Sequence, residues 1–184
     1  MKKKAVEAAR TEFNRACDSV HALSAATDHD QIQTHWAAFL SAAARMFNKL
    51  KAGAKAPPQS KLWYESKVRQ RQDDQLLCYI WHARNADEHG LELLTRKQPG
   101  FIREVSPTPQ ELEAFARTKC DRPAAFTGHS VLEITQPHVR LLDVLDHGVR
   151  YSPPPDCIKP YNTGMLALSR LEPILCEAEA LVLK

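Results

Sequence analysis

The densest group of side chains able to carry out chemistry lies between Trp81 and Gly90, at the end of an apolar stretch. It contains two histidines, an arginine, an asparagine and two carboxylates. Histidine can donate and accept a proton near neutral pH, and the donors of arginine match the oxygens of a phosphate group. Arg84, Asn85 and His89 are therefore candidates for a site that binds an anion and transfers protons.

Helical spacing would bring these side chains close to one face. Asn85 and His89 are four residues apart, His82 precedes His89 by seven, and the long side chain of Arg84 can lean across. A structural role explains the same residues, because Arg84 can pair with Glu88 one turn later while His89 caps the helix end. Such a pair contributes only about 0.2–0.5 kcal/mol. Both interpretations stay open at this point.

The segment from Arg84 to His89 resembles the Arg-Asn-x-x-x-His form of the HEPN motif, an arginine followed after four to six residues by a histidine. HEPN domains are bundles of four or five α-helices that usually dimerise, with the motif late in a core helix. Many members are metal-independent endoribonucleases of toxin–antitoxin, phage-defence or RNA-processing systems. Others bind nucleotides or act as inactive scaffolds.

The resemblance implies a role for each matching residue. Arg84 would contact the scissile phosphate, Asn85 would orient groups at the site, and His89 would be the general acid/base, a function that typically contributes ~10²–10⁴-fold to the rate. It also implies RNA as a partner, a homodimer formed through the motif helix, and no cofactor; a further protein partner stays unidentified. The alternative is a non-catalytic helical interaction or scaffold protein in which the motif is architectural.

Other chemistries find less support in the sequence. A carboxylate-bridged metal site on helices uses Glu-x-x-His pairs, and the sequence contains none, although metal-ligand chemistry is available at His82, Asp87, Glu88 and His89. There is also no Gly-x-Ser-x-Gly elbow and no glycine-rich loop of the kind that cradles phosphate. We therefore predict neither a metal nor a cofactor.

Composition and charge describe an ordinary globular chain. Of its 184 residues, 43% are apolar and 26% are charged. Residues 1–72 carry 13 basic and 6 acidic side chains, whereas residues 73–184 carry 12 and 16. A basic half permits a polyanionic partner, although solvated helices show similar imbalance. The sequence has no apolar run of about 18–20 residues and no signal-peptide core, so we expect no membrane contact. The number of cysteines, five, is odd, and free thiols are typical of a cytoplasmic protein.

The elements that must position the motif are mostly helical. Apolar residues recur at helical spacing over residues 4–25 and 30–52, with an N-cap for the second helix among Thr27, Asp28 and Asp30 and a stop at Gly53. A third helical region covers about 60–89, either as one helix or as two pieces broken near Asp73.

Residues 91–158 change character and hold eight of the 12 prolines. A capping box at residues 108–111 predicts a helix to about 119, β-like segments cover 131–135, 139–145 and 149–151, and Asp146-His147-Gly148 fits a hairpin turn. A final helix at about 162–183 contains Pro173, which predicts a kink or a late start. We therefore predict a single domain, residues 1–184: a mostly α, HEPN-like bundle of four long helices with an α/β excursion (about 91–158) inserted before the last helix.

Overall fold

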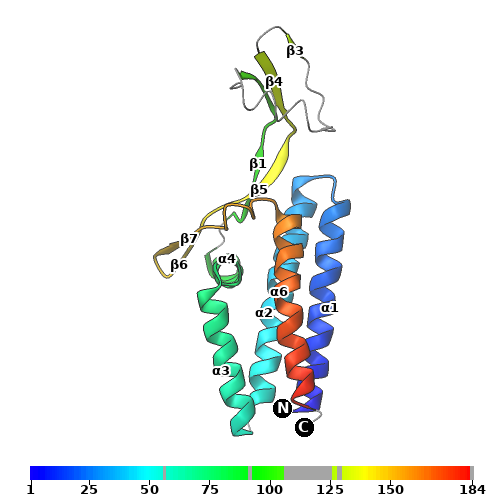
Figure 1. Ribbon diagram of the computed structural model, residues 1–184, viewed down its shortest axis with the longest axis vertical. Helices are drawn as coiled ribbons and strands as arrows, with labels where there is room; N and C mark the ends of the chain where they lie inside the picture. The colour runs from blue at the N-terminus through cyan, green and yellow to red at the C-terminus, as the bar shows by residue number, and fades with distance from the viewer. Residues whose placement is uncertain (56, 91–92, 106–125, 128–129, 183–184) are drawn as a thin grey trace. The chain divides into compact units, whose positions relative to one another are not determined.

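The computed structural model describes residues 1–55, 57–90, 93–105, 126–127 and 130–182, with only the backbone described for 89–90, 103–105, 126–127 and 130–134 (Figure 1). These residues form two compact units, Met1–Arg96 with Val139–Lys184, and Lys97–His138. The capping box at 108–111 and the helix predicted to follow it lie outside the described residues. The predicted mostly helical fold with an excursion before the last helix is confirmed.

Helices α1 (Lys3–Ala25) and α2 (His29–Ala54) match the two helices predicted first. Asp28 is the N-cap of α2, and its carboxylate accepts a hydrogen bond from the backbone N–H of Gln31 at 2.8 Å. Gly53 lies inside α2 rather than ending it. A Cβ at this position would lie 2.7 Å from Cβ of Ala5, so the glycine permits a close approach between the two helices.

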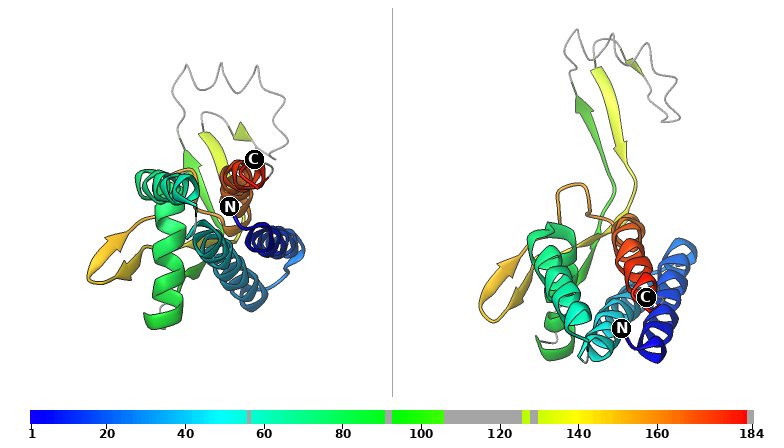
Figure 2. Two further views of the ribbon diagram at one scale, coloured as in Figure 1. Left: turned by 90° about the horizontal axis from the view of Figure 1, so that it is seen from below. Right: turned by 60° about the horizontal axis from the view of Figure 1, so that its bottom comes forward.

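The core of the larger unit lies among α1, α2 and α6 (Pro160–Ala180), whose ribbons run side by side in Figures 1 and 2. The apolar stripe of α1 predicted from spacing is buried along its length. From α2 and α6, the largest side chains with at most 1% exposure are Trp36, Phe39, Leu40, Met46, Leu50, Leu171, Ile174 and Leu175. Burying side chains of this kind contributes about 1.5–3 kcal/mol each before entropy is counted.

The third helical region consists of two helices, α3 (Pro58–Asp73) and α4 (Gln75–Gly90), so the two-piece alternative is confirmed. Asp74 separates them with an extended backbone, and its carboxylate accepts hydrogen bonds from the N–H groups of Leu76 and Leu77 at 2.9 and 3.0 Å. Arg170 of α6 pairs with the same carboxylate. The new helix axis runs across that of α3 (Figures 1 and 2).

Side-chain contacts fasten α6 to the helices around it. Glu179 forms a two-pronged ion pair with Arg10 of α1 at 2.8 and 2.9 Å, while Glu177 accepts from Trp63 and Lys67 of α3. The helix begins at Pro160, with a proline at N1, and continues through Pro173 to Ala180, so the late start that Pro173 predicted is wrong.

The excursion forms small sheets. In the larger unit, β6 (Val144–Asp146) and β7 (Val149–Tyr151) form an antiparallel hairpin, and their turn has positive φ at both His147 (49°) and Gly148 (77°). This geometry matches the turns that suit twisted hairpins. The β-like segment at 139–145 is divided into two strands, because residues 142 and 143 separate β6 from β5 (His138–Leu141).

Among its described residues, the smaller unit contains a three-stranded antiparallel sheet of β2 (Phe101–Val105), β3 (Phe126–Thr127) and β4 (Ser130–Thr135), in the order β2-β4-β3. Its register pairs Arg103 with Glu133. Strand β1 (Thr95–Gln98) pairs with β5 in a separate two-stranded sheet.

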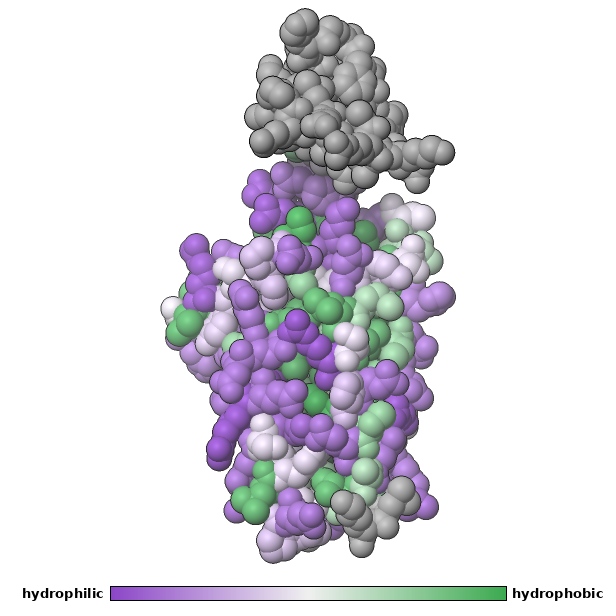
Figure 3. All heavy atoms as spheres, in the orientation of Figure 1, coloured by the Kyte–Doolittle hydropathy of each residue, from purple (hydrophilic) through white to green (hydrophobic). Residues whose placement is uncertain are grey.

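One face of the molecule is mainly polar. Hydrophilic side chains dominate the face drawn in Figure 3, with apolar side chains visible between them. None of the helices in the described part of the chain combines the length and apolar character needed to cross a membrane. The described cysteines, at positions 17, 78, 157 and 176, are free thiols.

Candidate functional site

Helix α4, which carries the motif, is fixed in place by a buried apolar face and by one side-chain hydrogen bond. Leu76, Leu77, Ile80 and Ala83 are at most 5% exposed and fix the orientation of the helix. The hydroxyl of Tyr79 donates a hydrogen bond to the carbonyl of Leu142 at 2.9 Å and so ties α4 to the start of the hairpin segment. The polar residues of the motif are thereby held on a rigid element.

Arg84 is held among polar neighbours on its own helix. Its Nη2 atom pairs with the carboxylate of Glu88, and its Nη1 atom donates to the side-chain oxygen of Asn85 at 3.3 Å. The side chain is 24% exposed. Its Nε atom is buried and has no hydrogen-bond partner among the described residues. The i,i+4 pairing expected from a structural role is therefore present, but it leaves the buried Nε–H donor without a partner among the described residues.

Asn85 connects the motif to the hairpin. Its amide nitrogen donates to Oδ2 of Asp146 at 2.9 Å, and the same oxygen lies 2.7 Å from Nδ1 of His82. Asp146 is only 8% exposed. The ring of His82 is stacked on Tyr151, with centroids 3.6 Å apart and planes 7° from parallel. Two residues of α4 and two of the hairpin therefore form one network.

The network stabilises a charged carboxylate. Burial opposes ionisation of Asp146, but hydrogen bonds from His82 and Asn85, with the nearby His147, outweigh it and lower the pKa of the carboxyl below its ordinary value of 3.8. The ionised carboxylate fixes the His82 ring through Nδ1. Nε2 is then the ring nitrogen that can exchange a proton with a ligand.

Asp87 is perturbed in the opposite direction. Burial raises the pKa of its carboxyl, the charge of Glu88 raises it further, and Arg84 partly offsets both effects. A carboxyl with a raised pKa beside an arginine is a feature that clusters at functional sites.

The structure brings Arg84 and Asn85 into contact. His89 lies within α4, but its side chain is outside the described residues. The sequence did not single out Asp146 as a site residue, since it fits a hairpin turn equally well, and His82 was noted only for its face of the helix. Among the described residues, no group of three histidine, cysteine or acidic side chains is arranged to hold a metal ion.

No family model, curated protein or solved structure matches the chain. The chemistry of the site therefore rests on its own residues.

Proposed function

We propose that the protein is a metal-independent endoribonuclease of the HEPN type, with its site at the end of α4. The observation that carries the proposal is the Arg84 guanidinium, which is held by Asn85 while its buried Nε lacks a partner among the described residues. A buried donor without a partner is costly in a folded protein and is common where function requires it. A phosphate oxygen is a suitable acceptor for this donor.

In the proposed mechanism, the ribose 2′-OH loses its proton and its oxygen attacks the adjacent phosphorus. The bond from phosphorus to the 5′-oxygen breaks, the leaving oxygen takes a proton, and a 2′,3′-cyclic phosphate remains. His89 moves the protons, and Arg84 offsets the charge that builds up on the phosphorane. Asn85, fixed by Asp146, keeps the guanidinium in place.

A homodimer is part of the same proposal. One arginine and one histidine make a sparse site, whereas a two-fold axis along the motif helix would bring two copies together. A dimer interface over α4 would also exclude water from the charged groups, which strengthens their interaction with phosphate.

The second candidate is a non-catalytic scaffold, favoured by the pairing of Arg84 with Glu88 and by the hydrogen bond from Asn85 to Asp146. The first contact stabilises α4 itself, and the second holds α4 against the hairpin. In this role Arg84 and Asn85 contribute only to the stability of the fold.

RNA cleavage in EDTA separates the two candidates. We expect wild-type protein to cut a mixed RNA, and Arg84→Ala, Arg84→Lys and His89→Ala each to lose activity by about 10²-fold or more. Lysine fails because it keeps the charge but lacks the fork of donors. The controls are Arg150→Ala and His21→Ala, which remove exposed side chains of the same types. Melting curves show whether each variant is folded. Equal cleavage by wild type and the motif variants would refute the proposal.

A further inference from the structure

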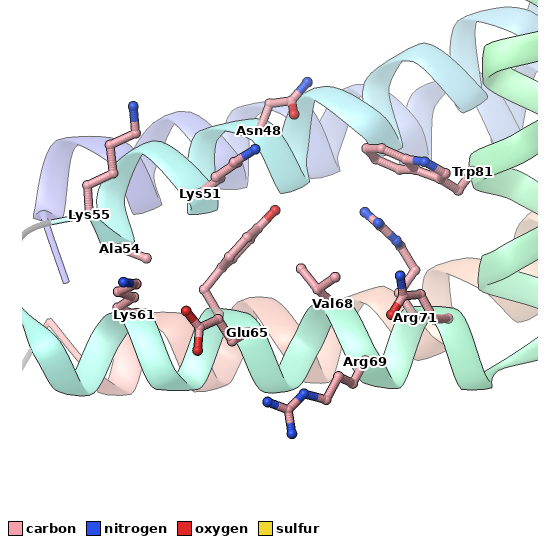
Figure 4. Close-up of a pocket in the computed structure, with 12 residues that line it drawn as sticks. Asn48, Lys51, Ala54, Lys55, Lys61, Glu65, Val68, Arg69, Arg71 and Trp81 are labelled. Atoms are coloured by element: carbon pink, nitrogen blue, oxygen red, sulfur yellow. The ribbon is translucent and has the colours of Figure 1, made fainter.

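A cavity of about 730 Å³ lies between α2 and α3, away from the motif residues of α4 (Figure 4). This volume is typical of small-molecule sites. Its walls combine apolar residues, among them Tyr64, Val68 and Trp81, with an unusual number of cations. Polar groups converging on an apolar cavity are the usual architecture of a ligand site.

The charge of the cavity is strongly positive. Lys51 of α2 and Lys55, which follows α2, contribute to the lining together with Lys61 and Arg71 of α3, and Glu65 is the acidic residue among the lining residues. Within the described part of the chain, none of these four cations has a carboxylate partner. Arg69 also borders the cavity, but its side chain points away from it in Figure 4. An anionic ligand would therefore meet several cations that form no ion pair with a described residue.

Arg71 is the buried cation of the cavity lining. It is only 9% exposed, and its side chain makes no hydrogen bond or ion pair with any described residue. Its guanidinium carbon lies 3.6 Å from the ring centroid of Trp81 and 5.2 Å from that of Phe47, so aromatic faces hold it in place. Burial lowers the pKa of this guanidinium, with the charges of Tyr64 and Cys78 acting in the opposite direction.

The chemistry of the lining identifies the class of ligand. The planar guanidinium has donors that match two phosphate oxygens, and the lysines can contact further phosphates as point charges. Tyr64 is half-buried and borders the same cavity, so it offers an aromatic surface to a planar group. Phosphate joined to a planar ring is the combination found in nucleotides.

We propose that this cavity binds a nucleoside phosphate, with its phosphate groups shared among Arg71, Lys51 and Lys61 and its base lying against the apolar wall. The nucleoside phosphate is either a free nucleotide or a unit of a single-stranded RNA. This site is separate from the motif and does not rest on cleavage there.

The test measures binding to two probes in EDTA. Calorimetry with ATP reports a free nucleotide, and fluorescence polarisation with a labelled 2′-O-methyl RNA dodecamer reports an RNA strand that the protein cannot cut. The key variants are Arg71→Gln, Lys51→Gln and Lys61→Gln. Lys49→Gln is the matched control, because Lys49 is exposed on α2 and is not part of the cavity lining. Circular dichroism verifies folding.

We expect at least one probe to bind, with affinity reduced about tenfold to a hundredfold by Arg71→Gln and several-fold by each lysine variant, and unchanged in Lys49→Gln. Binding of ATP identifies a free nucleotide, whereas binding of the dodecamer alone identifies an RNA strand. If Arg71→Gln fails to fold, the proposal is tested by comparing the binding affinities of Lys51→Gln and Lys49→Gln. The proposal is overturned if neither probe binds, or if the control weakens binding as much as Lys51→Gln.

Discussion

Replacing Asp146 with asparagine removes the charge at the centre of the α4–hairpin network and keeps its shape. In the wild type, one carboxylate oxygen accepts from His82 at 2.7 Å and from Asn85 at 2.9 Å. The amide oxygen of Asp146→Asn can occupy the same position, so both hydrogen bonds persist in neutral form. What is lost is the difference between charged and neutral hydrogen bonds.

The size of this loss follows from the geometry. A hydrogen bond to a charged group contributes about 1.5–3 kcal/mol, and a neutral one about 0.5–1.5 kcal/mol. Two such differences would reach roughly 2–3 kcal/mol, but His82 is 23% exposed and water screens part of the effect, which leaves about 1–2 kcal/mol. For a chain of 184 residues, this corresponds to a Tm lowered by roughly 2–8 °C.

Thermal unfolding followed by circular dichroism at pH 7 measures the change, with Asp143→Asn as the control because Asp143 is exposed in the same segment. The pKa of Asp146 is lower in the folded protein, so its charge stabilises the fold above the ordinary value of 3.8, and this advantage is lost as the pH falls through the folded pKa. The Tm difference must therefore vanish in strong acid. A Tm within 1 °C of the control at pH 7, or a Tm difference that does not shrink as the pH falls below 3.8, would refute the reasoning.

Three further outcomes can be checked with the purified protein. Gly164→Ala should lower stability by about 1–3 kcal/mol in urea unfolding, because its new Cβ would lie 2.7 Å from Val20 of α1; an unchanged midpoint would contradict the close packing of α6. Folding and RNA cleavage should survive EDTA, and a Tm that falls with EDTA and recovers with Zn²⁺ or Mn²⁺ would contradict this. Light scattering should give twice the 20.7 kDa of one chain, and a monomer at micromolar concentration would rule out the dimer.

Local spacing predicted the helices well, because their burial follows directly from periodicity. Val6, Phe13 and Val20 mark the stripe of α1, and all three are at most 5% exposed in the structure. The break between α3 and α4 was left open. It depends on Asp74, whose partner Arg170 is 96 residues away, and short-range patterns carry no information about such contacts.

In the candidate site, too, local contacts could be predicted from the sequence and long-range contacts could not. The contact between Arg84 and Asn85 follows from their adjacency on one helix. The contact of Asn85 with Asp146 spans 61 residues and depends on where the hairpin packs. The burial of Arg71 could not be predicted either, because Arg71 lies in a polar stretch of the sequence. It is buried only because Phe47 and Trp81 come together around it.

The central claim is that Arg84 and His89 catalyse attack by a ribose 2′-OH without a metal. Its most direct test compares two labelled oligonucleotides of one sequence in EDTA, one entirely RNA and one with 2′-deoxyribose throughout. We predict that wild-type protein cuts only the RNA and leaves a 2′,3′-cyclic phosphate and a 5′-hydroxyl, and that His89→Ala leaves both intact. Cleavage of both oligonucleotides, RNA products without the cyclic phosphate, or no cleavage of RNA by the wild-type protein would contradict the account.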